Sequence, residues 1–117
     1  MTPNEAVDAL VSHFDSVFFA ALAEPVRISI VREMLVLGEP ADINTIAARV
    51  PQDRSVVSRH LQTLLQADIV STHKEGRHRF YTLRGGSLAD RLEELASLTR
   101  RAMSVCCPPI SCCGSKE

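Results

Sequence analysis

The chain has 117 residues, enough for one domain with a modest core, and its 45% apolar and 23% charged residues are ordinary for a folded protein. It contains no run of about 18 uncharged apolar residues, and its first residues lack the basic segment of a signal peptide. These features predict a cytoplasmic protein without a membrane partner.

The net charge of −1 is unevenly distributed along the chain. Residues 54–84 contain six Lys and Arg residues against two acids, whereas the rest of the chain carries a net charge of −5. A basic segment within an acidic protein is typical of a surface that binds a polyanion. Chance clustering of charge is the alternative at this point.

Helical periodicity dominates the first part of the chain. Between residues 4 and 21, apolar side chains recur every three or four positions, which predicts one amphipathic helix. Pro25 suits the first turn of a second helix, which we expect to end at about Leu37, before Gly38. The expected buried side of this second helix consists of Ile28, Ile30, Val31, Met34 and Leu35.

Two short helices joined by a tight turn come next. Asp42 can cap a helix over residues 43–50, and Asp53 can cap another from Arg54 to about Gln66. The second of these helices opens with polar and basic residues. This combination is the helix-turn-helix pattern.

A β-hairpin with a basic tip is predicted over residues 69–83, because two runs that favour strands flank Lys74, Glu75 and Gly76. Gly85 and Gly86 are expected to break the chain before a last helix over residues 87–104. Apolar residues in that helix recur at alternating steps of four and three, a spacing that suits pairing with another helix.

A helix-turn-helix followed by a basic hairpin forms a winged helix, so the predicted fold is mainly α with a β-hairpin wing. The second helix of the pair enters the major groove of DNA in such folds. The candidate DNA-binding residues are Arg54, Ser55, Val57, Ser58, Arg59 and His60 on the helix, and Lys74, Arg77, His78 and Arg79 on the wing. Three alternatives stay open: Val57 in the core, a structural hydrogen bond for His60, and wing charges that only solvate an edge hairpin.

All four cysteines lie within the last twelve residues of the chain, at Cys106, Cys107, Cys112 and Cys113. In a cytosolic protein such a cluster indicates metal ligands or redox thiols before it indicates disulfides. Pro108 and Pro109 stop a helix and could fold the second pair of cysteines toward the first. Converging thiolates select soft ions such as arsenite, antimonite, Cu(I), Hg(II), Cd(II) or Zn(II). A tail with incidental thiols and a redox or persulfide sensor are the alternatives.

Two motifs carry a family resemblance: S-x-x-S-R-H-L-x-x-L at Ser55–Leu64 and E-G-R-x-x-x-Y at Glu75–Tyr81. Together with the flanking segments, residues 20–84 resemble the ArsR/SmtB family of metal-responsive winged-helix repressors. The resemblance implies a homodimer formed by the first and last helices, with operator affinity that falls when an inducer binds. Asp68 departs from the glycine usual after the recognition helix, although Asp tolerates the left-handed conformation better than most residues.

The resemblance also narrows the inducer site. Many members carry cysteines on the helix before the recognition helix, but residues 43–50 contain none. Another family site uses acids and histidines of the last helix, and residues 87–104 contain no histidine. The tail, in which Cys106 and Cys107 precede Cys112 and Cys113, resembles the arsenic-responsive members.

The predicted protein is therefore a repressor that binds operator DNA as a homodimer and dissociates when As(III) or Sb(III) binds its cysteine thiolates. Residues 1–105 would form the DNA-binding and dimerisation domain, with residues 4–21 and 87–104 at the dimer interface, and residues 106–117 the sensing tail. Sensing of another thiophilic ion, or of thiol oxidation or persulfides, is the alternative. An enzyme is not expected, because no phosphate-binding loop or H-E-x-x-H motif is present, and a metallochaperone would not need the basic helix and wing.

Overall fold

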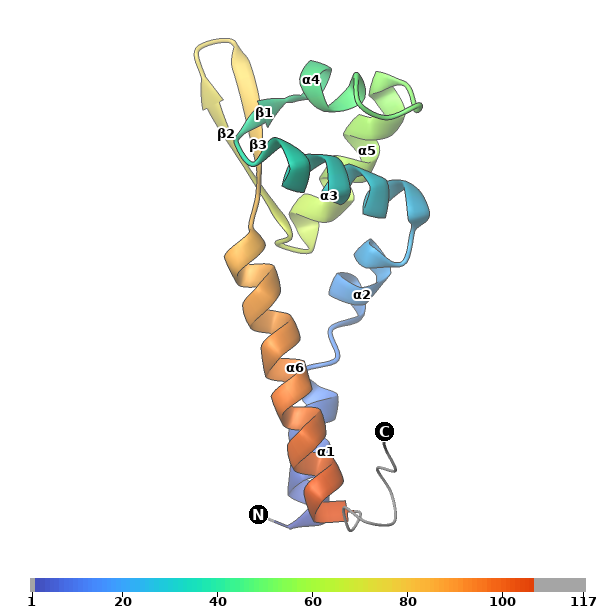
Figure 1. The fold of residues 1–117 in the computed structure, drawn as a ribbon, viewed down its shortest axis with the longest axis vertical. Helices are drawn as coiled ribbons and strands as arrows, with labels where there is room; N and C mark the ends of the chain where they lie inside the picture. The colour runs from blue at the N-terminus through green and yellow to red at the C-terminus, as the bar shows by residue number, and fades with distance from the viewer. Residues whose placement is uncertain (1, 107–117) are drawn as a thin grey trace. The chain divides into compact units, whose positions relative to one another are not determined.

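The computed structural model describes residues 2–106, which are mainly helical with a small antiparallel sheet (Figure 1). The helices and strands, in chain order, are α1 (Pro3–Ser12), α2 (Ser16–Leu22), α3 (Pro25–Leu37), β1 (Ala41–Asp42), α4 (Ile43–Ala47), α5 (Arg54–Gln66), β2 (Val70–Glu75), β3 (His78–Leu83) and α6 (Gly85–Cys106). Two compact units are distinguished: a central unit over residues 16–87, and a terminal unit that combines the chain up to Asp15 with the chain from Leu88 onward.

The single helix predicted over residues 4–21 is wrong, because the chain forms α1 and α2 with a break between them. A capping box at Thr2 starts α1. The helix ends where the side chains of Ser12 and His13 both hydrogen-bond to the carbonyl oxygen of Ala9, at 2.8 and 2.9 Å. Side-chain bonds of this kind compete with the backbone ladder of a helix, and apolar periodicity does not register them.

Helix α3 begins at Pro25 and ends at Leu37, as predicted, and Gly38 closes it with a left-handed φ of 67°. Three of the expected core positions are buried, namely Ile30, Val31 and Met34. Ile28 and Leu35 were assigned to the core incorrectly, since they are 53% and 61% exposed. They lie seven residues apart on a neighbouring face of the helix, which the core does not cover.

An aspartate caps the N-terminus of each helix in the helix-turn-helix, as predicted. A carboxylate oxygen of Asp42 accepts a hydrogen bond from the backbone N–H of Thr45 at 2.9 Å, and one of Asp53 accepts from that of Val56 at 3.1 Å. Helix α4 is shorter than expected, whereas the bounds of α5 are those predicted. Asp68 follows α5 with φ of 60°, which confirms that this aspartate takes the place usual for glycine.

The predicted hairpin forms between β2 and β3, in which Glu75 lies opposite His78. Gly76 occupies the first central position of the two-residue turn with φ of 64°, a conformation that glycine adopts without steric cost. Strand β1 was not predicted; it pairs with β3 and gives the strand order β1-β3-β2. A strand of two residues is too short for an alternating pattern to appear in the sequence.

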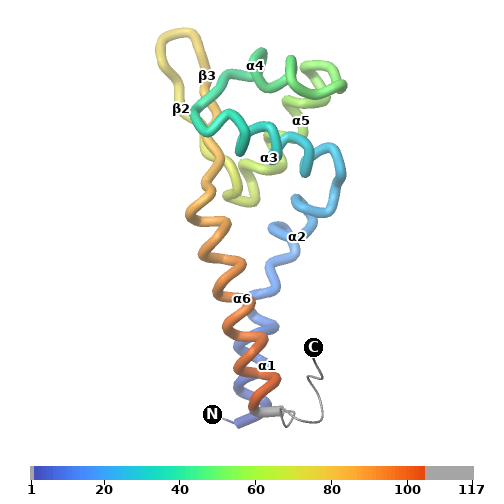
Figure 2. Tube along the Cα trace, in the orientation of Figure 1, coloured from blue at the N-terminus to red at the C-terminus, as the bar shows by residue number. Residues whose placement is uncertain are grey.

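The central unit, whose Cα trace is drawn in Figure 2, closes around an apolar core to which each of its helices contributes side chains. Its largest fully buried side chains are Phe18, Ile30, Ile46, Val57, Leu61, Leu64, Ile69 and Val70. Helices α2, α3 and α5 pack against one another, and β2 packs on α5. The hairpin continues past this core, and its turn projects away from the helices (Figure 1).

Helix α6 begins at Gly85, so the prediction that Gly85 and Gly86 break the chain is wrong. A Cβ atom built at either glycine would meet open space, which means that no close contact requires glycine there. Within residues 2–106, no helix is long and apolar enough to span a membrane.

The terminal unit is a pair of helices with a narrow buried seam. Ala6 of α1 and Leu98 and Ala102 of α6 are buried. Two ion pairs at the surface join the same chain segments, His13 to Glu94 at 3.9 Å and Asp15 to Arg91 at 3.7 Å. Four large apolar side chains of this unit remain exposed, namely Val7, Val11, Phe14 and Leu92.

Candidate nucleic-acid interface

The predicted DNA-binding residues at the start of α5 form an exposed polar surface. Arg54, Ser55, Ser58 and Arg59 are all exposed. Within residues 2–106, neither of the two arginines forms a salt bridge with an acid. Val57 is fully buried in the core, which corrects its place among the DNA-contacting residues: a side chain without exposed surface cannot reach a base.

The carboxylate of the capping residue Asp53 offsets the partial positive charge at the N-terminus of α5. Asp53 accepts hydrogen bonds from the backbone N–H of Val56 and from the hydroxyl of Ser55, at 3.1 and 2.9 Å. These two bonds, the first being stronger, lower the pKa of the Asp53 carboxyl. The backbone N–H of Val57 is also bonded, to the carbonyl oxygen of Asp53. The backbone N–H groups of Val56 and Val57 are therefore not free to bind an anion at this helix end.

His60 is half-buried and lies on a different side of α5 from Arg59. A guanidinium nitrogen of Arg27 lies 3.1 Å from the Nδ1 atom of His60. A guanidinium can only donate hydrogen bonds, so Nδ1 is the acceptor. This contact favours the structural role for His60, and direct binding of His60 to DNA stays a prediction.

The hairpin forms a second exposed cationic surface. Lys74, Arg77, His78 and Arg79 are exposed, and none of them forms a salt bridge within the described part of the chain. Lys74 lies directly opposite Arg79 across the two strands. Like charges in directly opposed positions destabilise a hairpin. A bound polyanion would relieve this repulsion, whereas a purely solvating role gives no reason for the pairing.

The other face of the hairpin carries His78 together with three residues that were not among the predicted DNA-binding residues. The ring of His73 stacks on that of Phe80 with centroids 5.7 Å apart, and His78 lies tilted against the same ring at 6.2 Å. His73 also lies 4.0 Å from a carboxylate oxygen of Glu75. The alternation of side chains along a strand was a usable signal, because it places all four residues on one face.

Asp42 lies within electrostatic range of both cationic regions. Hydrogen bonds from the backbone and side chain of Thr45 lower the pKa of Asp42 most strongly, and the charges of His78 and Arg54 lower it further. His78 belongs to the hairpin and Arg54 to α5. One residue of each region thus lies close enough to Asp42 to act on its carboxylate electrostatically. The remaining arginine of the basic segment, Arg84, is paired with Asp68 at 3.6 Å.

The cysteine cluster lies almost wholly beyond the structure. Cys106 is the last residue of α6, and Cys107, Cys112 and Cys113 lie outside the described residues. Among residues 2–106, no group of three or more His, Cys, Asp or Glu side chains is arranged to hold a metal ion. The proposed thiolate ligand set thus stays a prediction.

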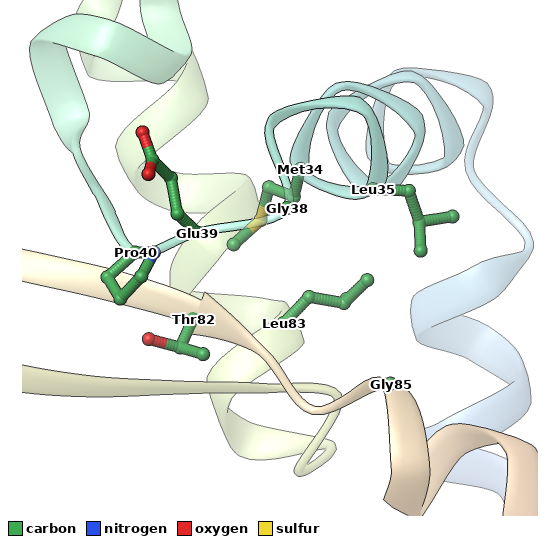
Figure 3. Close-up of a pocket in the computed structure, with 8 residues that line it drawn as sticks. All are labelled: Met34, Leu35, Gly38, Glu39, Pro40, Thr82, Leu83 and Gly85. Atoms are coloured by element: carbon green, nitrogen blue, oxygen red, sulfur yellow. The ribbon is translucent and has the colours of Figure 1, made fainter.

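A pocket of about 210 Å³ opens in the central unit between the end of α3 and the end of β3 (Figure 3). Met34 and Leu83 both line it, and its polar side chains come from Glu39 and Thr82. The lining contains no cysteine or histidine, so it offers no thiolate or imidazole ligand. None of the predicted DNA-binding residues lines the pocket.

Solved structures provide the comparison with known proteins, since no protein-family model and no curated protein matches the chain. The chain is similar to a possible transcriptional regulator for arsenical resistance, with 32% identity, 72% of this chain and 81% of that chain covered, and a TM-score of 0.54. It is also similar to an ArsR-like transcriptional regulator from Rhodococcus sp. RHA1, with 26% identity, 77% and 87% covered, and a TM-score of 0.63.

A third structure shows how far the fold extends. The transcriptional repressor BigR from Xylella fastidiosa is 16% identical, covers 98% of this chain with 100% of its own, and gives a TM-score of 0.56. All three are transcriptional regulators and not enzymes. With a helix-turn-helix and wing at the predicted positions, and 32% identity to a regulator of which it covers 81%, the chain belongs to the ArsR/SmtB family of winged-helix transcriptional regulators.

Proposed function

We propose that the chain is a transcriptional repressor that binds operator DNA as a homodimer and releases it when arsenite or antimonite binds the cysteines of residues 106–117. One observation carries the DNA-binding part: α5 and the hairpin present five exposed cations without a salt bridge in the described chain. These are Arg54, Arg59, Lys74, Arg77 and Arg79. Each cation that meets a DNA phosphate releases condensed counterions, which favours binding.

Helix α5 is suited to base reading because one of its sides is anchored in the apolar core and another is exposed. Val57, Leu61 and Leu64 are fully buried on one side of it, while Ser58 and Arg59 are exposed. An α-helix fits the major groove, and an arginine there can make two hydrogen bonds to guanine. We assign base reading to Ser58, Arg59 and Arg54, and phosphate contacts to the wing cations.

Homodimerisation is supported by the apolar surface of the terminal unit. Val11, Phe14 and Leu92 are 54%, 51% and 48% exposed. Exposed apolar side chains gathered on one small unit are typical of an association surface. Two copies joined there would present two α5 helices, so the operator should contain half-sites about one helical turn apart, roughly 34 Å.

The chemistry of the tail supports a metalloid inducer, and the similar structure named for arsenical resistance agrees with that class. Trivalent arsenic binds three thiolates, and soft thiolate ligands select soft ions. Each of three cysteine thiols would form one S–As bond to arsenous acid and release one water molecule, without oxidation or reduction. Cys106 and Cys107, with either Cys112 or Cys113, supply the three thiols.

Gel-shift titration of the full chain with an operator selected from random duplexes tests the proposal. Arsenite should weaken operator binding by roughly 5- to 150-fold, the usual range of allosteric coupling. A Cys106→Ser, Cys107→Ser protein should bind DNA with unchanged affinity and no longer respond. Release of DNA by arsenite from a chain truncated after Val105 would contradict thiol sensing, because no cysteine would remain.

Parallel titrations with Cd(II), Zn(II) and hydrogen peroxide separate the alternative inducers. A response to one of these, with none to arsenite, would replace the inducer and leave the repressor assignment in place. Failure of the full chain to select any duplex would contradict the DNA-binding part itself.

A further inference from the structure

Arg27, in the first turn of α3, joins three helices of the central unit through its guanidinium group. Its Nε atom donates a hydrogen bond to the carbonyl oxygen of Ala21 at 2.8 Å, and Nη2 donates to that of Ala20 at 3.1 Å. The third nitrogen, Nη1, donates to Nδ1 of His60 on α5 at 3.1 Å. The bonds to Ala21 and His60 are partly buried, so water competes weakly for them, whereas the bond to Ala20 is exposed.

The two bonds to α2 hold the guanidinium in place. Ala20 and Ala21 lie in the last turn of α2, where carbonyl groups carry partial negative charge; the carbonyl oxygen of Ala20 also accepts a hydrogen bond from the backbone N–H of Ala23 at 3.2 Å. A planar guanidinium that is fixed by two of its donors has little freedom left for the third. The nitrogen that faces His60 is thereby aimed at a defined point on α5.

His60 lies at the edge of the buried side of α5. It is three residues after Val57 and four before Leu64, both fully buried, so it is adjacent to them on the helix surface. Because Nδ1 accepts the bond from Arg27, the neutral ring carries its proton on Nε2. Within residues 2–106, no other hydrogen bond joins a side chain of α3 to α5.

The remaining contacts of α5 with the core are aliphatic. Burial of Val57, Leu61 and Leu64 stabilises the packing, but apolar contacts have no preferred direction. A hydrogen bond to a ring nitrogen requires near-linear geometry. It therefore restrains rotation of α5 about its axis, which apolar packing restrains less sharply.

We propose that Arg27 is a positioning residue for DNA reading: through His60 it fixes the rotation of α5 and so the direction in which Ser58 and Arg59 project. The inference rests on the proposed role of α5 at the operator. Arg27 itself does not contact DNA in this arrangement. Its loss should reduce discrimination between operator and unrelated DNA, while the cations that bind phosphate remain.

Four variants of the full chain separate positioning from charge and from fold stability. Arg27→Lys keeps a cation near the end of α2 without the planar fork, and Arg27→Ala removes both. His60→Asn keeps an acceptor near the position of Nδ1, whereas His60→Leu removes it at similar volume. Fluorescence anisotropy at fixed salt gives the affinity for the selected operator and for unrelated DNA of equal length.

We expect Arg27→Lys, Arg27→Ala and His60→Leu to lower operator affinity about tenfold, as for one lost charge-assisted hydrogen bond, with unchanged affinity for unrelated DNA. His60→Asn should retain most of the discrimination. Nitrogen-15 spectra should show Nδ1 of His60 unprotonated in the native chain, with a resonance that moves in Arg27→Lys. A merely structural role would lower thermal stability without changing the ratio of the two affinities.

Two results would overturn the positioning role: an operator-to-unrelated affinity ratio that is native in both Arg27→Lys and His60→Leu, or a protonated Nδ1 in the native chain. The variants at His60 keep Arg27 in place, so they remain informative if Arg27→Ala does not fold. Arg59→Ala distinguishes a failure of the positioning role of Arg27 from a failure of the proposed role of α5. If it also leaves operator affinity unchanged, the proposed role of α5 fails; if it alone lowers affinity, only the positioning role fails.

Discussion

The central and terminal units differ in the size of the apolar core that each of them buries. In the central unit, helices α2, α3, α4 and α5 all contribute fully buried side chains to a common core. In the described part of the terminal unit, the buried apolar side chains are Ala6, Leu98 and Ala102, while larger ones such as Phe14 and Leu92 are about half exposed. A single copy of the chain thus forms a full core in the unit proposed to read DNA, although Ile28, Leu35 and Val36 of α3 remain exposed there, whereas the helix pair buries little of its apolar surface.

This difference assigns separate physical roles to the two units. A core with many large side chains gives a rigid body that can hold α5 and the hairpin in a fixed relation. Two helices that bury mainly alanine and leucine gain little stability by themselves, because small assemblies bury a small share of their surface. Association with a second copy would supply the missing burial, which links the stability of the terminal unit to dimerisation.

Matched leucine-to-alanine changes give the largest expected effect. Leu61→Ala removes a fully buried side chain of the central unit and should lower the free energy of unfolding by about 2–5 kcal/mol. Leu92→Ala, at a half-exposed site of the terminal unit, should lower the free energy of unfolding less. This loss should grow with protein concentration as dimers form. Urea unfolding at two concentrations measures both. Equal, concentration-independent losses would remove the contrast between the units.

A charge placed on each apolar surface tests which of them is covered by a second copy. Val11→Glu should abolish dimerisation at micromolar concentration, because burial of an unpaired carboxylate costs several kcal/mol. Val36→Glu, at an equally exposed site on α3 of the central unit, is the control and should leave the dimer intact. Sedimentation velocity distinguishes the two states. A monomeric native chain, or a dimer lost only in Val36→Glu, would place the association surface elsewhere.

Cations from the two units separate DNA reading from general charge. Arg59→Ala in the central unit should weaken operator binding by about 1–3 kcal/mol, as for loss of one base contact. Arg100→Ala removes an exposed cation of α6 in the terminal unit and should have little effect at physiological salt. Anisotropy titrations with the selected operator provide the comparison. A larger loss from Arg100→Ala would move the DNA surface to the terminal unit.

Within the central unit, Lys74 lies opposite Arg79, and removal of its charge should have two smaller effects. It should weaken DNA binding and raise the stability of the free protein. Lys74→Thr should reduce the slope of log affinity against log salt by about 0.9, as for one lost phosphate contact. The same change should slightly stabilise the DNA-free protein, because it relieves repulsion across the hairpin. Binding at several salt concentrations and a thermal melt without DNA measure the two effects. An unchanged salt slope would indicate that the wing does not meet phosphate.

Local signals made most of the central unit predictable. The N-caps Asp42 and Asp53, Pro25 and Gly38 act within one helical turn, so the sequence around them predicts where helices begin and end. The break after α1 depends instead on side-chain bonds to Ala9. Periodicity alone also could not separate the covered from the uncovered faces of α3, because exposed apolar residues are common.

The candidate interface was predictable in composition but not in detail. Charge clustering and the helix-turn-helix pattern indicated the exposed cations of α5 and the hairpin. Whether Val57 faced DNA or the core depended on the rotation of α5, which tertiary packing decides. The contact of Arg27 with His60 joins residues 33 positions apart. No local pattern in one sequence predicts such a pair.

The smallest expected effect concerns acid stability, which the structure assigns to the central unit through the caps of its helices. The hydrogen bonds from Val56 and Ser55 lower the pKa of Asp53 below its ordinary value of about 3.9. A lowered pKa in the folded state means that the carboxylate contributes stability above the unfolded value, and that this contribution disappears as pH falls through the folded value. Asp53→Asn should therefore have a lower free energy of unfolding than the native chain at pH 7. This difference in free energy should shrink as the pH falls toward 3. Urea unfolding at pH 7, 5 and 3 measures it, with Asp90→Asn on α6 of the terminal unit as the control. A difference between Asp53→Asn and the native chain that is constant with pH would show that the cap acts by its shape and not by its charge.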